Sequence, residues 1–121
     1  MDSDQSHLRY IEASSVDTPL GNLKEMKLVS PSNDDLGKLD GMIFDPWERH
    51  VCYFVVESRR GFRTRRYLLP ATPAPIESSG RAMRVDVERD DLRALPQLNS
   101  ALYPRMSDAD LVAALFSPRA A

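Results

Sequence analysis

The sequence has a single cysteine and only two histidines among its 121 residues. One cysteine excludes an internal disulfide framework and a multi-cysteine zinc site. His7 and His50 lie far apart in the sequence, without convergent partners, so we predict a solvated surface position for both. No apolar run approaches the roughly 20 residues that a membrane-spanning helix needs. The polar, acidic start MDSDQS does not resemble a secretory signal. We therefore expect a cytoplasmic protein without membrane insertion, metal or cofactor.

Hydrophobic residues make up 42% of the chain and charged residues 28%, which is typical of one globular domain with one core. We predict a β domain over residues 21–99. Residues 1–20 have no sustained period, and we predict a flexible tail with a short ordered piece at Leu8–Ile11. Residues 100–121 are predicted to form a C-terminal extension with a short helix.

The β prediction rests on five short segments separated by turn residues. The strongest is Val51–Glu57, whose Val-Cys-Tyr-Phe-Val-Val core is β-branched and aromatic. It is apolar on both faces, which indicates a strand covered on both sides. Leu36–Asp45 contains two glycines, which indicates a bend or a close approach of backbone. The other predicted strands are Lys24–Ser30, Phe62–Leu69 and Ala82–Val87.

The C-terminal helix has a start signal and an apolar stripe. Ser107 can cap the helix, and Asp108 and Asp110 fall in its first turn, where negative charge is favoured. Leu111, Leu115 and Phe116 follow at helical spacing. Since so short a helix is marginal alone, this stripe is predicted to dock on the domain.

One run of motifs resembles a known family. LGKLDGMIFDP leads into RHVCYFVVE, followed by RYLLP and MRVDV. In this order and spacing the motifs resemble the PRC-barrel family, over residues 23–98. The resemblance implies a mainly β fold, a small, highly bent PRC-type barrel. It also implies an adaptor role, since family members dock on larger complexes such as the photosynthetic reaction centre and the maturing small ribosomal subunit.

The charges are unevenly distributed. Residues 1–48 hold ten acidic and four basic side chains, whereas residues 49–84 hold eight basic side chains, all arginine, and two acidic ones. The basic region is centred on a predicted hairpin with its turn at residues 58–61. Arginine suits bidentate contacts to phosphate or carboxylate, but charge on an edge hairpin also prevents aggregation. The candidate partner-binding residues are Arg59, Arg60, Arg63, Arg65 and Arg66.

A second apolar face is predicted outside the barrel core. We expect it to be covered by the C-terminal helix, by a second copy of the chain in a homodimer, or by both, because an open patch of that size is unusual on a monomer. Cys52 is assigned to packing on this face rather than to nucleophilic chemistry. The candidate apolar interface residues are Met42, Phe44, Cys52, Phe54, Val56, Leu111, Leu115 and Phe116.

No constellation of reactive residues emerges from the sequence. The acidic residues between Asp34 and Asp45 lack the spacing of a calcium loop, and no acid–base pair or activated nucleophile is apparent. We therefore predict a non-enzymatic protein-interaction or assembly module. Two alternatives stay open: an RNA-associated or ribosome-maturation role using the arginine hairpin, and peripheral association with a membrane electron-transport complex.

Overall fold

The protein is mainly β, as predicted, and its helices are few and short. The structure is a computed structural model that describes residues 7–19, 21–71 and 81–110. Its strands are β1 (Arg9–Glu12), β2 (Asp17–Thr18), β3 (Gly21–Asn22), β4 (Lys27–Val29), β5 (Asp35–Asp45), β6 (His50–Arg60), β7 (Arg63–Pro70) and β8 (Ala82–Arg84). Its 3-10 helices are η1 (Ala13–Ser15), η2 (Leu23–Glu25), η3 (Arg89–Ala94) and η4 (Ser100–Leu102).

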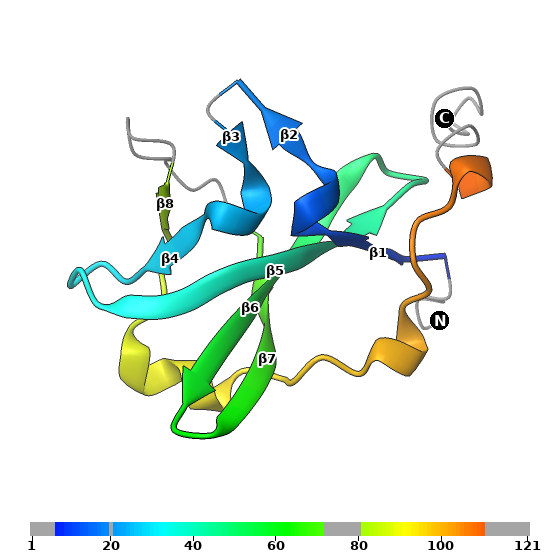
Figure 1. Ribbon diagram of the computed structural model, residues 1–121. Helices are drawn as coiled ribbons and strands as arrows, with labels where there is room; N and C mark the ends of the chain where they lie inside the picture. Colours follow the sequence, from blue (N-terminus) through cyan, green and yellow to red (C-terminus); the bar gives the residue numbers. More distant parts are fainter. Residues whose placement is uncertain (1–6, 20, 72–80, 111–121) are drawn as a thin grey trace.

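Six strands form one mixed sheet, organised around the long strand β5 (Figure 1). The sheet order is β7-β6-β5-β4-β8, and β1 also pairs with β5. Along one side of β5, residues 35–38 pair with β4 and residues 41–44 pair with β1, while the other side pairs with β6. Among the paired strands of the described residues, β4 and β8 are the one parallel pair. Within the described residues no ladder joins the end strands β7 and β8.

Two β-bulges in the β5–β6 ladder decide which side chains of these strands share a face of the sheet. In the β5–β6 ladder Leu39 pairs with Val56 and Gly41 pairs with Val55, so Asp40 is an extra residue. Cys52 is the extra residue in β6. A bulge shifts the side-chain alternation by one residue. The side chains of β5 and β6 therefore do not alternate strictly between the two faces at Asp40 and Cys52.

The two faces of β5 and β6 carry separate hydrophobic clusters. The larger cluster contains Leu39, Met42 and Val56, with Phe54 and Val51 packed against it. The smaller one consists of Leu8, Ile43, Val55 and Leu68, with Tyr10, Cys52, Tyr53, Leu98 and Tyr103 packed around it. The prediction that Val51–Glu57 is covered on both sides is confirmed.

The predicted second apolar face needs correction. Met42, Phe54 and Val56 belong to the larger core rather than to an outer face. Phe44 is half-buried and belongs to neither cluster, and Cys52 lies at the edge of the smaller one. The cover over the smaller cluster comes from the chain itself, through N-terminal and C-terminal residues. Leu111, Leu115 and Phe116 lie outside the described residues, and their docking stays a prediction.

The N-terminal segment is more ordered than predicted. Arg9–Glu12 pairs with β5 in the register Arg9 to Phe44, and Asp17–Thr18 pairs with β3. Leu8 and Ala13 are buried. The ordered piece predicted at Leu8–Ile11 coincides with Leu8 and β1, whereas the flexible-tail prediction is wrong for η1 and β2. Two apolar side chains anchor a segment whose overall composition is polar. The remaining domain boundaries stay predictions.

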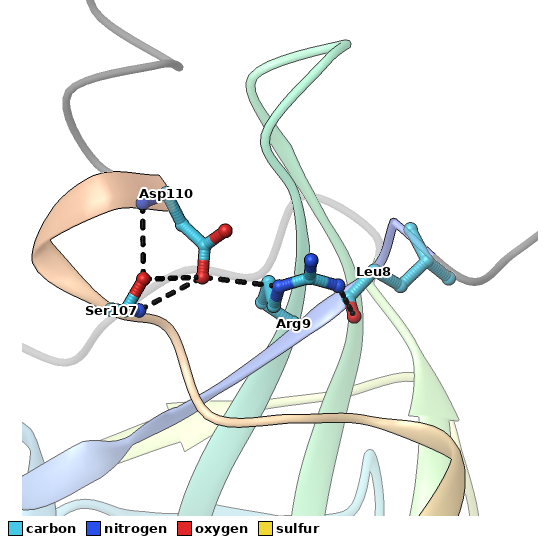
Figure 2. Close-up of polar contacts among 4 residues, drawn as sticks. All are labelled: Leu8, Arg9, Ser107 and Asp110. Carbon is cyan, nitrogen blue, oxygen red and sulfur yellow. Dashed lines mark hydrogen bonds and ion pairs between the residues drawn. The ribbon is translucent and has the colours of Figure 1, made fainter.

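The C-terminal segment packs beside β1. The Tyr10 amide donates to the Pro104 carbonyl at 2.8 Å, and the Met106 amide donates to the Tyr10 carbonyl at 2.9 Å. The Ser107 hydroxyl then accepts from the Asp110 amide, while the Asp110 carboxylate accepts from the Ser107 amide. This reciprocal cap confirms the predicted helix start. The Arg9 Nε donates to the same carboxylate with a separation of 3.1 Å, and Figure 2 draws these contacts.

Candidate anion-binding site

The arginine-rich region forms a two-stranded hairpin at the edge of the sheet. Arg60 pairs with Arg63, so the turn consists of Gly61 and Phe62. The centre of this turn lies two residues later than the centre of the predicted turn at residues 58–61. Gly61 has a φ of +61°, a conformation that glycine adopts without a side-chain penalty. Phe62, predicted as the first residue of the returning strand, is instead fully exposed at the tip.

The predicted arginines divide between the two faces of the hairpin. Directly opposed residues in an antiparallel pair point to the same face, and Tyr67 opposes Val56 of the larger core. Arg63 and Arg65 therefore share the face of Tyr67, whereas Arg66 lies on the opposite face. By the same alternation Arg59, which opposes Thr64, starts from the face of Arg66, yet at the turn end of the hairpin it lines one hollow with Arg63 and Arg65. The Arg60 side chain lies outside what the structure describes. The sequence treated the arginines as one group, but strand alternation separates them.

Arg66 is held by ion pairs on its own face. Its Nε lies 3.3 Å from Asp40 Oδ2, and its Nη2 lies 3.5 Å from Glu57 Oε2. The Tyr10 hydroxyl donates to Asp40 Oδ2 at 2.5 Å. Burial, followed by this hydrogen bond, raises the pKa of Tyr10 above its ordinary range. The tyrosine therefore stays neutral and serves as a donor, not as a base.

The absence of a side chain at Gly41 leaves room for the Tyr10 ring beside β5. A Cβ atom at Gly41 would lie 2.4 Å from the Ile11 carbonyl oxygen and 2.6 Å from the Tyr10 hydroxyl. At Gly37 it would lie 2.2 Å from the Glu57 carbonyl oxygen. The prediction that glycines in this strand mark close backbone approach is confirmed.

Arg63 and Arg65 line a hollow of about 350 Å³ together with two arginines from η3. Arg89 and Arg93 come from this helix, which lies beside the turn end of the β6–β7 hairpin (Figure 1). Tyr67 and Leu92 contribute buried side chains to the lining. Arg59 and Ser58 complete it.

No acidic side chain is among the described residues that line this hollow. None of Arg59, Arg63, Arg65, Arg89 and Arg93 forms an ion pair with an acidic side chain of the described residues. A guanidinium offers up to five donors in a planar fork suited to carboxylate or phosphate. The arrangement is therefore suited to binding a group with several negative charges.

A second hollow of about 490 Å³ adjoins the first. It shares Arg59 and Arg89 with the first hollow and adds Lys27 and Lys38. Asp35 and Glu57 also line it. The basic surface therefore extends from the hairpin towards β4 and β5, although its charge becomes mixed there.

The sequence analysis missed Arg89 and Arg93. Arg89 and Arg93 are four residues apart, with Leu92 between them. This spacing predicts one helical turn in which both arginines flank a buried leucine. Nothing local indicates that this turn packs beside the hairpin. In the structure Leu92 is buried and lines the hollow together with Tyr67 of β7.

Cys52 lacks the properties of an activated nucleophile. Its Sγ lies 3.7 Å from Nε2 of His50, the residue two positions earlier at which β6 begins. Burial raises the pKa of Cys52, and the Asp45 carboxylate raises it further. The thiol is therefore kept protonated, whereas nucleophilic chemistry requires a thiolate.

The prediction of a solvated position is wrong for His7. Its ring stacks on Trp47 with centroids 3.7 Å apart, and its Nε2 lies 3.2 Å from Asp45 Oδ1. Burial alone would raise the pKa of Asp45, but hydrogen bonds from the Glu48 amide, His7 and the Trp47 amide lower it overall. His7 thus helps to hold the N-terminal segment, whereas His50 is exposed as predicted.

Two further observations concern what the described residues lack. No three His, Cys, Asp or Glu side chains among them are placed to hold a metal ion. None of their helices has the length and hydropathy of a membrane span.

No family model matches the chain, and no curated protein matches its sequence. The resemblance to PRC-barrel proteins therefore stays a prediction.

Proposed function

We propose that this protein is a non-catalytic interaction module with a PRC-barrel type of fold, and that it docks on an acidic segment of a partner protein. The docking surface is the arginine-lined hollow. The observation that carries the proposal is the convergence of Arg63, Arg65, Arg89 and Arg93 on one concavity without ion pairs to described acidic residues. Such a set favours multiply charged anions.

The fold part of the proposal is supported by local features. The motifs of the resemblance fall on β5, β6, β7 and β8 in order. Gly37 and Gly41 allow the close backbone contacts expected in a small, strongly bent sheet. The non-catalytic part is supported by the raised pKa of Cys52 and of Tyr10, which leave neither group suited to act as nucleophile or base.

The partner is proposed to be another protein, in the cytoplasm. A homodimer through the arginine surface is disfavoured, since it would bring arginines of two copies together. A homodimer through another surface stays compatible with the proposal.

A labelled oligoglutamate of twelve residues tests the proposal by fluorescence anisotropy at several salt concentrations. Binding is expected to weaken as salt rises. The double variant Arg63→Gln/Arg65→Gln is expected to bind at least about tenfold more weakly, because two charge-assisted contacts are lost. Arg66→Gln is the matched control, since Arg66 lies on the same strand but on the opposite face. Equal affinity of the double variant and the wild type would contradict the proposal.

RNA binding is the second candidate function. The fully exposed Phe62 favours it, because an aromatic ring beside arginines can stack a base while the arginines bind phosphates. A labelled uridine dodecamer in the same titration separates the two. RNA binding that is weakened by Phe62→Ala, together with no binding of oligoglutamate, would replace the first candidate by the second.

A further inference from the structure

The outer edge of β7 is covered along only part of its length. The Leu68 amide donates to the Pro96 carbonyl at 2.8 Å, and the Leu98 amide donates to the Arg66 carbonyl at 2.9 Å. Tyr67 and Gln97 form the bridge between these bonds. Residues 96–98 thus extend the sheet beside the second half of β7.

The first half of β7 has no such neighbour. Backbone groups of alternate strand residues point to the same edge, so the outward groups of Arg66 and Leu68 place those of Thr64 on this edge too. Among the described residues, no strand or bridge pairs with Arg63–Arg65 on that side. The chain preceding Pro96 forms η3 instead, and the arginine-lined hollow lies between this helix and β7.

This edge and the hollow together define the shape of a ligand. An extended segment beside Arg63–Arg65 would pair with the Thr64 backbone. Its residues opposite Arg63 and Arg65 would point to the same face as these arginines, about 7 Å apart because strand residues rise about 3.4 Å each. Arg89 and Arg93 line the hollow on that face. Every second side chain of the segment would therefore meet arginine.

We propose that the acidic segment binds as an added β-strand at Arg63–Arg65, with carboxylates at alternate positions. This inference rests on the proposed function and adds the binding mode and the sequence pattern of the partner. Strand addition supplies backbone hydrogen bonds, while alternate side-chain pockets supply specificity. Addition of a second copy through the same edge is disfavoured, since arginines would oppose arginines.

Four labelled nine-residue peptides test the inference by fluorescence anisotropy. The first, ETETETETE, alternates glutamate and threonine, and the second, EETTEETTE, has the same composition with the glutamates grouped in adjacent pairs, so that no two of them lie two residues apart. The third and fourth are the alternating peptide with N-methylated amides at every threonine or at every glutamate. Because a strand directs amides of alternate residues to opposite edges, only one methylated peptide should lose binding.

The inference expects the alternating peptide to bind at least tenfold more tightly than the grouped one. One methylated peptide should lose at least tenfold in affinity, and the other should match the alternating peptide. Thr64→Pro should weaken the alternating peptide as well, since it removes the outward amide without removing a β6–β7 hydrogen bond. Circular dichroism and unchanged binding of the grouped peptide check that this variant folds.

The inference and the proposed function can fail separately. If all four peptides bind equally and in a salt-dependent manner, acidic binding stands and strand addition is overturned. If no acidic peptide binds, both are overturned. If both methylated peptides lose binding equally, the single-edge pairing is overturned.

Discussion

The two faces of β7 use arginine in different ways. On one face, Arg66 lies within ion-pair distance of Asp40 and Glu57, and the Tyr10 hydroxyl bonds the same Asp40 oxygen. On the other face, Arg63 and Arg65 line a hollow with Arg89 and Arg93, and none of the four pairs with a described acidic residue. Neighbouring positions on one strand therefore have different electrostatic surroundings.

This difference separates a structural arginine from available ones. The Arg66 pairs link β5, β6 and β7 on a face where β1 and residues 98–103 complete the packing. The four arginines around the hollow repel one another, and solvent and salt screen that repulsion. A bound anion would offset this repulsion between the arginines. We therefore expect substitutions on the paired face to change stability, and substitutions at the hollow to change binding.

The largest effect on the paired face is expected at Gly41. Replacement by alanine places a Cβ where the Ile11 carbonyl and the Tyr10 ring already lie, and should cost about 3 kcal/mol of unfolding free energy. Gly61→Ala is the control, because no atom lies within 4 Å of its Cβ and only the positive φ costs about 1 kcal/mol. Urea unfolding measures both. Equal losses would show that the close approach at Gly41 does not matter.

Asp40→Asn tests the centre of the paired face. The substitution removes the negative charge that pairs with the Arg66 guanidinium and accepts the hydrogen bond of the Tyr10 hydroxyl. It should lower the unfolding free energy by about 1.5 kcal/mol. Oligoglutamate affinity should not change, since the hollow lies on the other face. Urea unfolding and the anisotropy titration supply the two readouts. A loss of affinity without a loss of stability would reverse the assignment of the faces.

Sequence reasoning identified the components of these faces better than their arrangement. The apolar pattern of Val51–Glu57 predicted burial on both sides, and the two glycines of β5 predicted close contacts. Both follow from residue chemistry that is local to one strand. The bulges at Asp40 and Cys52 were not predictable, since an extra residue exists only relative to a pairing partner.

The same limit applies to the candidate site. The arginine-rich hairpin was visible as a run of charge, but its division between two faces depended on where the turn lies. A turn at Gly61 and Phe62 fixes the register, and the register places Arg66 opposite Glu57. Arg89 and Arg93 join the site through a tertiary contact of η3 that carries no local signal in the sequence.

Tyr10 makes the stability of the protein depend on pH in the alkaline range. Because its pKa in the folded protein is raised by burial and by Asp40, its contribution to stability is fully present below about pH 10 and is lost as pH rises further. Tyr10→Phe should cost about 1 kcal/mol at pH 8 and should flatten the fall in stability between pH 8 and pH 11. Urea unfolding at both pH values measures this. Parallel falls in the variant and the wild type would contradict the role of Tyr10.

The smallest effects come from neighbouring arginines and contrast the two faces most directly. Arg66→Gln should lower the unfolding free energy by about 0.5 kcal/mol, since its side chain is about half exposed and its ion pairs are partly screened. Arg65→Gln removes a charge from an unpaired cluster, so stability should stay unchanged or rise slightly at low salt. Thermal unfolding of both variants at 20 and 300 mM salt measures the difference, which should shrink as salt screens both effects. If Arg65→Gln is the more destabilising of the two, Arg65 has a structural role on its own face, and the contrast between paired and available arginines fails.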